Sequence, residues 1–174
     1  MARVSNPTIE IRVLDCRLEG WGLPRYQSAL AAGIDLFACL DAPLRLSPGA
    51  PAVLIPAGFA LHMANSGMAA LIVPRSGLGH KQGLVLGNSV GVLDADYTGP
   101  VLISAWNRNP PGSAMPIEIN PGDRIAQMLF VPVLRPEFTV VADFTVASAR
   151  GDGGFGSTGT TAAAPQNRPI DRAR

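Results

Sequence analysis

Hydrophobic residues in this chain gather in short runs separated by turn-forming residues. The runs are four to ten residues long, and Pro, Gly, Asn and Asp lie between them at close spacing. None is followed by an amphipathic helical pattern of about 10–15 residues. We therefore expect strands at residues 9–14, 33–40, 52–61, 69–74, 101–106, 117–120, 125–133 and 138–144.

This pattern predicts an all-β fold, a jelly-roll-like sandwich or barrel, and not an α/β fold. Helix is expected only as a turn or two around residues 78–82. After Phe144 the strand pattern stops, and the small, polar and Gly residues that follow cannot bury enough apolar surface to order themselves. We expect a β domain at residues 1–149, a flexible Gly-rich arm at 150–159 and a disordered tail at 160–174.

Composition narrows the class of protein. The 174 residues fit one domain, and 47% hydrophobic residues with a net charge of +1 argue against a disordered chain and a nucleic-acid binder. No stretch reaches the roughly 18 apolar residues of a membrane span, and the first residues lack a signal-peptide core. Cys16 and Cys39 lack metal-binding spacing, so we expect buried, reduced thiols in a cytoplasmic protein.

The first candidate for chemistry is the stretch PRSGLG at residues 74–79, which directly follows an apolar run. Arg75 supplies a fork of N–H donors and Ser76 a hydroxyl, while Gly77 lets backbone N–H groups approach an anion closely. This stretch is not a Walker loop. A solvated turn with a surface arginine is the plain alternative.

The second candidate is GNSVGVLDADYTG at residues 87–99, which has turn formers around an apolar centre. This pattern predicts a hairpin with Asn88, Asp94 and Tyr97 at its base and sides. The Asn amide can read a pyrimidine edge, and the Tyr ring can lie flat against a sugar or base. Asp94 is either a turn cap or a carboxylate that activates water.

Two further stretches place polar residues in apolar runs. Asp35 interrupts the run at 33–40, where it is either hydrogen-bonded structure or, beside a phosphate site, a group that holds metal-bound water. In NPGDRIAQ, Asp123 and Arg124 are expected to pair with each other, and Gln127 can satisfy a neighbour's backbone. These groups are compatible with one anion-binding site.

The last stretch, RGDGGFGSTG at residues 150–159, contains five glycines. Arg150, Ser157 and Thr158 can contact phosphate oxygens, and Phe155 can stack on a base. The alternative is a flexible linker that carries one arginine. The other four stretches favour an arm that closes over a bound nucleotide.

In order and spacing, these five stretches resemble the five motifs of the deoxyuridine triphosphate nucleotidohydrolases (dUTPases), over about residues 9–159. The resemblance implies a jelly-roll subunit in a homotrimer, with active sites at the subunit interfaces. It also implies Mg²⁺ bound mainly by the triphosphate, and hydrolysis of dUTP to dUMP and pyrophosphate.

By position, the resemblance makes Asp94 the catalytic carboxylate, Asn88 the uracil-reading amide and Tyr97 the ring that contacts deoxyribose. The other matching positions are the phosphate loop (Arg75, Ser76, Gly77), the nucleoside-lining residues (Val92, Leu93, Leu102), the residues near the phosphates and the waters of the metal (Asp35, Gln127), and the closing arm (Arg150, Phe155, Ser157, Thr158).

The chain departs from the family pattern at residues 27–33, in a longer connection at 109–116 and in the extension at 160–174. None of these departures includes a residue assigned to chemistry. A dCTP deaminase of the same superfamily is an alternative, but residues 87–99 offer no further proton shuttle besides Asp94 and Asp96. A nucleotide-binding protein without activity would require a lost catalytic carboxylate, and Asp94 is present.

Overall fold

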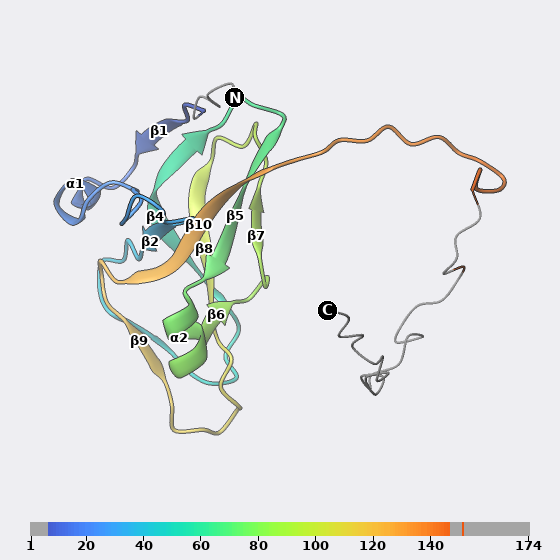
Figure 1. The fold of residues 1–174 in the computed structure, drawn as a ribbon. Helices are drawn as coiled ribbons and strands as arrows, with labels where there is room; N and C mark the ends of the chain where they lie inside the picture. The colour runs from blue at the N-terminus through green and yellow to red at the C-terminus, as the bar shows by residue number, and fades with distance from the viewer. Residues whose placement is uncertain (1–6, 147–150, 152–174) are drawn as a thin grey trace, which may run out of the picture. The chain divides into compact units, whose positions relative to one another are not determined.

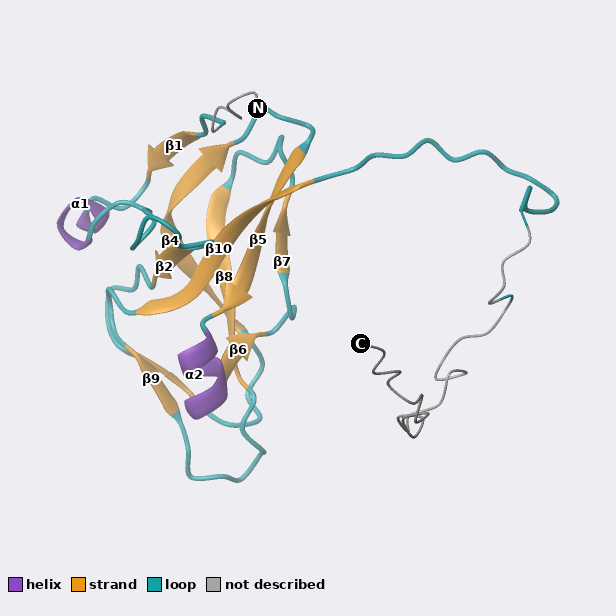
Figure 2. Cartoon of the chain, in the orientation of Figure 1, coloured by secondary structure: helices purple, strands orange, loops and turns teal. Residues whose placement is uncertain are grey.

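The computed structural model describes residues 7–146 and 151 of the chain. Within them, strands dominate and the helices are short (Figures 1 and 2). The strands are β1 (Glu10–Val13), β2 (Ile34–Phe37), β3 (Leu44–Leu46), β4 (Val53–His62), β5 (Met68–Pro74), β6 (Leu84–Leu86), β7 (Gly91–Leu93), β8 (Pro100–Asn107), β9 (Ile117–Ile119) and β10 (Arg124–Pro132), and the helices are α1 (Arg17–Trp21) and α2 (Ser76–Lys81).

The strands form two four-stranded sheets and one two-stranded sheet. Their orders are β1-β4-β8-β6, β2-β10-β5-β7 and β3-β9. Every pair between these strands is antiparallel. The predicted all-β class is therefore confirmed.

One hydrophobic core lies between the sheets. In β8 every second side chain is buried, and besides Asn107 these are the apolar residues Val101, Ile103 and Ala105. These residues belong to one cluster with Leu36 and Met128 of the other large sheet. Burying such side chains drives folding, so the period of two along the strands selects which face of each sheet turns inward.

Seven of the eight expected strands are confirmed, with ends that differ by a few residues. The eighth, at residues 138–144, is wrong: no strand forms there, and Phe138 and Val140 are more than nine-tenths exposed. The expected helix is confirmed as α2. The short strands β3, β6 and β7 and the helix α1 were not predicted, because three to five residues do not display a period.

The chain divides into two compact units, Met1–Arg135 and Pro136–Arg174. The first contains all the strands and helices, and the described residues of the second, 136–146 and 151, contain neither. The proposed boundary at residue 149 stays a prediction. In the part of the chain that the structure describes, no helix is long and apolar enough to cross a membrane.

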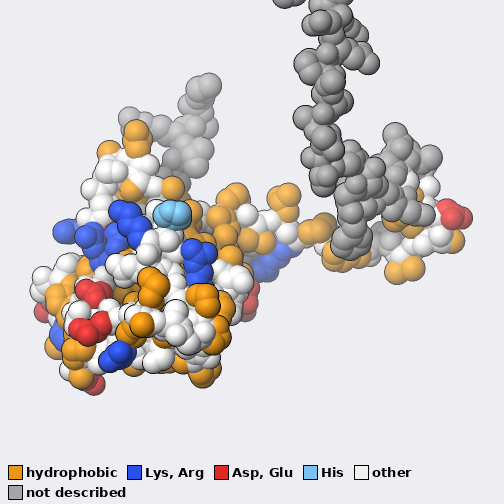
Figure 3. Space-filling view, turned by 90° about the horizontal axis from the view of Figure 1, so that it is seen from below, with side chains coloured by type: hydrophobic (Ala, Val, Ile, Leu, Met, Phe, Trp, Pro, Cys, Tyr) orange, Lys and Arg blue, Asp and Glu red, His pale blue; other side chains and the backbone are white. Residues whose placement is uncertain are grey.

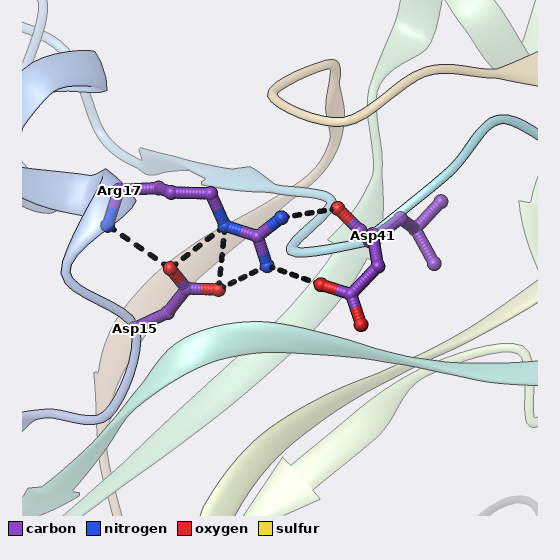
Figure 4. Close-up of polar contacts among 4 residues, drawn as sticks. Asp15, Arg17 and Asp41 are labelled. Carbon is purple, nitrogen blue, oxygen red and sulfur yellow. Dashed lines mark hydrogen bonds and ion pairs between the residues drawn. The ribbon is translucent and has the colours of Figure 1, made fainter.

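An ion-pair cluster connects α1 to the end of the segment that follows β2 (Figure 4). The Arg17 guanidinium donates to both carboxylate oxygens of Asp15, at 2.6–3.1 Å, and to the carbonyl of Leu40, and it pairs with Asp41 at 3.2 Å. The hydrogen bond from Arg17 lowers the pKa of Asp15 to about 2.

Both cysteines are free thiols, but only Cys39 is buried, and Cys16 is exposed. The expectation of two buried thiols is therefore wrong for Cys16, which lies just before the first turn of α1. Burial raises the pKa of the Cys39 thiol to about 11. Cys39 is consequently a packing residue, which lies against Gly58.

The Asp15–Arg17 pair predicts a stability that depends on pH. Because folding lowers the pKa of Asp15 from 3.8 to about 2, its contribution is present above pH 3.8 and is lost as the pH falls toward 2. We expect Asp15→Asn to unfold more easily than the wild type at pH 7, and the difference to shrink between pH 4 and 2. Urea titrations at several pH values measure it, and a difference that stays constant with pH would contradict it.

Gly58 predicts a second effect on stability. It has φ +82°, and a Cβ there would lie 2.5 Å from Sγ of Cys39 and 3.0 Å from Cδ1 of Leu18. We expect Gly58→Ala to lower the free energy of unfolding by about 2–4 kcal/mol, from backbone strain and overpacking together. Gly112→Ala is the matched control, since Gly112 has φ +83° and nothing within 4 Å of its Cβ position. Equal losses in denaturant unfolding would show that packing around Gly58 contributes nothing.

Candidate functional site

The stretch that follows β5 forms one wall of a cleft of about 400 Å³. Arg75 has an extended backbone (φ −78°, ψ 128°) and directly precedes α2, so β5 passes straight into the helix. The far wall comes from β2 and β10. The lining residues are Asp35, Arg75, Ser76, Gly77, Leu78, Lys81, Gln82 and Gln127.

Asp35 joins two arginines beside this cleft. Its carboxylate lies 3.0 Å from Nε of Arg75 and 3.1 Å from an Nη of Arg124, and its side chain is 14% exposed. The Arg75 guanidinium also donates to the carbonyl of Arg124 at 2.9 Å. These contacts come from β2, the end of β5 and β10, so they hold the Arg75 guanidinium in one orientation.

The expected pair between Asp123 and Arg124 is wrong. Arg124 pairs with Asp35, whereas Asp123 accepts a hydrogen bond of 2.7 Å from the backbone N–H of Asn120. An aspartate that caps its own turn is the ordinary behaviour of a turn sequence. Asp123 lies in the turn before β10 and Arg124 is the first residue of that strand, so the two side chains take different partners.

Gln127 occupies the middle of its sheet. It is aligned with Asp35 on one side and with Val73 on the other. Its side-chain N–H donates to the carbonyl of Pro74 at 3.0 Å. Gln127 therefore satisfies a neighbour's backbone, which is one of the two roles expected for it; the other is a position near the phosphates. It also lines the cleft, so both interpretations remain open.

A second cleft, of about 190 Å³, lies where β7 ends and β8 begins. Its lining residues are Val92, Leu93, Asp94, Tyr97, Pro100, Val101 and Leu102. Asp94 is exposed at the end of β7, and its carbonyl accepts the N–H of Tyr97 at 3.2 Å. The Tyr97 hydroxyl donates to the carbonyl of Pro100 at 3.0 Å, which folds the ring back across the loop.

The predicted hairpin at residues 87–99 is wrong as a pair of strands. β7 pairs with β5, and β8 pairs with β4 and β6, so the two walls of the second cleft belong to different sheets. Turn formers flank both kinds of connection, and the sequence therefore cannot distinguish them. The structure nonetheless brings Asp94 and Tyr97 to one cleft, together with the apolar positions Val92, Leu93 and Leu102.

Asn88 lies outside both sets of lining residues. It belongs to the turn between β6 and β7, next to Ser89, which has φ 62°. Its side-chain nitrogen lies 3.6 Å from the position that a Cβ on Gly91 would take. Arg150, Phe155, Ser157 and Thr158 fall outside the described residues.

The two clefts lie at opposite ends of β5. Leu93 is aligned with Ala70, whereas Arg75 follows the last residue of the strand. Five residues of strand at about 3.3 Å each separate Ala70 from Arg75 by about 17 Å. In Figure 1, α2 lies at the lower end of β5, and β7 runs upward beside β5.

The sequence did not indicate three features of the first cleft. Lys81 and Gln82 line it, and Arg124 pairs across it. Lys81 lies four residues after Gly77 in α2, a spacing at which residues share a face, but the helix was expected only around residues 78–82. The partner of Arg124 depends on the alignment of β2 with β10, which only the fold fixes.

Comparison with known proteins gives a consistent result. The dUTPase family model matches residues 19–159. The chain is 51% identical to the deoxyuridine 5′-triphosphate nucleotidohydrolase of Burkholderia lata over 151 residues, which are 87% of this chain and 97% of that protein.

Two solved structures from phages are also similar to the chain. The dUTPase of Staphylococcus bacteriophage 80alpha with dUpNHpp has a TM-score of 0.79 and 26% identity, covering 89% of this chain and 100% of that one. A mutant dUTPase from phage phi11 of S. aureus, described with a coordinated structural Mg(II) ion, has a TM-score of 0.68 and 25% identity, covering 80% of this chain and 99% of that one. From the family model and the curated relative together, the chain belongs to the dUTPase family.

Proposed function

We propose that this chain hydrolyses dUTP to dUMP and pyrophosphate, and thereby removes dUTP and supplies dUMP for thymidylate synthesis. Water attacks the α-phosphorus, its proton passes to Asp94, and the bond to the bridging oxygen breaks as pyrophosphate leaves. The observation that carries this proposal is the division of the family's motif residues between a cleft with cationic groups and a cleft with a carboxylate.

The first cleft suits the phosphates. Arg75 is held by Asp35 and by the carbonyl of Arg124, so its donors need little reorganisation when an anion binds. The Ser76 hydroxyl and the backbone N–H groups at Ser76 and Gly77 add neutral donors, and Gln127 adds an amide. In this proposal Asp35 acts mainly by positioning Arg75.

The second cleft suits the nucleoside. Its walls are apolar at Val92, Leu93 and Leu102, and they can exclude a pyrimidine with a 5-methyl group. Tyr97 lies against the sugar and leaves no room for a 2′-hydroxyl. Asn88, in the turn before β7, reads the edge of the uracil together with backbone groups.

Mg²⁺ fits this site as an ion carried mainly by the triphosphate. Among the described residues, no three His, Cys, Asp or Glu side chains are grouped so as to hold a metal. One Asp35 oxygen accepts an N–H of Arg124 and the other forms an ion pair with Arg75, and a carboxylate with these contacts can still accept from a water of the ion. When bound, the ion neutralises charge on the phosphates.

The remaining motif supplies the arm. Arg150, Ser157 and Thr158 are proposed to contact the phosphates, and Phe155 to cover the uracil, as residues 150–159 close over the nucleotide. A cytoplasmic location completes the proposal. The two free thiols fit it, since disulfides are typical of oxidising compartments.

The separation of the two clefts supports a site built between copies of the chain. Ala70, which is aligned with Leu93, lies about 17 Å from Arg75 along β5, and this backbone separation is longer than a triphosphate, which supports a site that takes Arg75 and Asp94 from different chains. We infer that Asp94 of one subunit meets Arg75 of another, in a homotrimer. In support, the second unit leaves Phe138, Val140 and Phe144 exposed, as a segment covered by other copies would.

Replacing Asp94 tests the reaction. We expect Asp94→Asn to lower kcat by about 10²–10⁴-fold with little change in nucleotide affinity, because a general base acts on the rate of the chemical step. Asp96→Asn is the matched control, since Asp96 lines a different hollow together with His62 and Arg135. Near-normal turnover of Asp94→Asn would contradict the assignment.

The assay used for these variants separates the alternative functions when it is applied to the wild type. It supplies dUTP, dCTP, dTTP and UTP with Mg²⁺ and follows pyrophosphate and ammonia separately. Pyrophosphate from dUTP alone is the expected result. Ammonia from dCTP would indicate a deaminase, and no product from any of the four would indicate a binding protein.

Mixing two inactive variants tests the shared site. We expect Asp94→Asn and Arg75→Ala to be almost inactive alone, and refolding them together to restore about a quarter of the sites, because random pairing of two subunits leaves that fraction intact. Light scattering should give the mass of a trimer. No recovery from mixed chains, or a monomeric mass, would overturn the shared site.

A further inference from the structure

Lys81 is the only lysine in the chain, and all other members of the 14 Lys and Arg residues are arginines. It is the last residue of α2 and lines the same cleft as Arg75 and Ser76. None of the roles proposed above uses it.

The geometry of α2 turns Lys81 toward the phosphate loop. Lys81 lies four residues after Gly77, so both share one face of the helix, and helical side chains lean toward the N-terminus. A Cβ at Gly77 would have nothing within 4 Å. Because no side chain occupies the space beside Gly77, the Lys81 side chain can extend past it toward Ser76 and Arg75.

The cations around this cleft differ in what they already bind. Arg75 and Arg124 are both paired with Asp35, at 3.0 and 3.1 Å. Lys81 has no ion pair within residues 7–146 and 151. Figure 3, which views the molecule from below, shows basic and acidic side chains on the same face.

The backbone beside Lys81 is well anchored. The N–H of Gln82 donates to Leu78 at 3.0 Å, and the carbonyl of Gln82 accepts the Asn109 side chain at 2.8 Å. The N–H of Arg108 donates to the carbonyl of Gly83 at 3.0 Å. Arg108 and Asn109 thus fix the end of α2, and at this end of the helix it is the Lys81 side chain that must be ordered when an anion binds.

We propose that Lys81 binds the β- and γ-phosphates of the substrate, because among the described residues that line the cleft it is the cation without an ion pair. An ammonium on a flexible stem has three rotatable donors and acts on phosphate as a point charge. It therefore complements Arg75, whose guanidinium is fixed. This assignment rests on the proposed function, because it presumes that a nucleoside triphosphate occupies the cleft.

A single lysine permits a direct readout. Reductive methylation with ¹³C-formaldehyde labels the Lys81 amine and keeps its positive charge, and the Lys81→Arg variant identifies its NMR signal. We expect dUpNHpp with Mg²⁺, and pyrophosphate alone, to shift this signal, and dUMP to leave it unchanged. An unmoved signal at saturating dUpNHpp would overturn the proposal.

Affinity measurements give a second test. We expect Lys81→Met to weaken dUpNHpp binding about tenfold or more, Lys81→Arg to lose less, and dUMP affinity to stay the same, since the lost contact is a hydrogen bond to a charged group. Arg108→Met is the matched control, because Arg108 is exposed near the same end of α2 but does not line the cleft.

The outcomes are distinguishable. If the wild type neither binds dUpNHpp nor hydrolyses dUTP, the proposed function fails. If the wild type does both and Lys81→Met binds equally well, only the role of Lys81 fails. A lower melting temperature of Lys81→Met with unchanged affinity would make Lys81 a structural residue of the helix end and would also overturn the proposal.

Discussion

Strand β5 is paired along both of its edges, and this constraint governs the arrangement of the site. β10 aligns with it from Met68 to Pro74, and β7 aligns with it at Ala70–Ile72. Neither neighbour can slide without turning buried side chains to the other face. The loop that begins at Arg75, at one end of β5, and the Asp94 carboxylate, near the other end, are therefore held at a fixed separation.

The two clefts near the ends of β5 differ in the charge and polarity of the residues that surround them. At the Pro74 end, β2 and β10 bring Asp35 and Arg124 to Arg75, and the charges compensate one another. A partly buried aspartate with two arginines limits the motion of both guanidinium groups, while its own negative charge reduces their attraction for an anion. Lys81, which lines the same cleft, has no ion pair among the described residues. At the other end the surroundings of Asp94 are largely apolar.

The two units of the chain differ in regular structure and in packing. The sheets, the Asp15–Arg17 cluster and the close packing at Gly58 fix the body of the first unit. Described residues of the second unit form no regular structure and expose large apolar side chains. Exposed apolar surface of this kind is typical of segments that other chains cover.

The sequence by itself determined the fold class and most strands, because alternating burial imposes a period of two that is visible in long runs such as Val53–His62. It also identified the stretches that carry Asp35, Arg75, Asp94 and Gln127, since polar residues stand out within apolar runs. Only the tertiary structure decided which strands pair with each other and which charged side chains form ion pairs. The pairing of β7 with β5, the Asp35–Arg124 ion pair and the exposure of Phe138 depend on contacts between distant segments, and local sequence does not encode which segments meet.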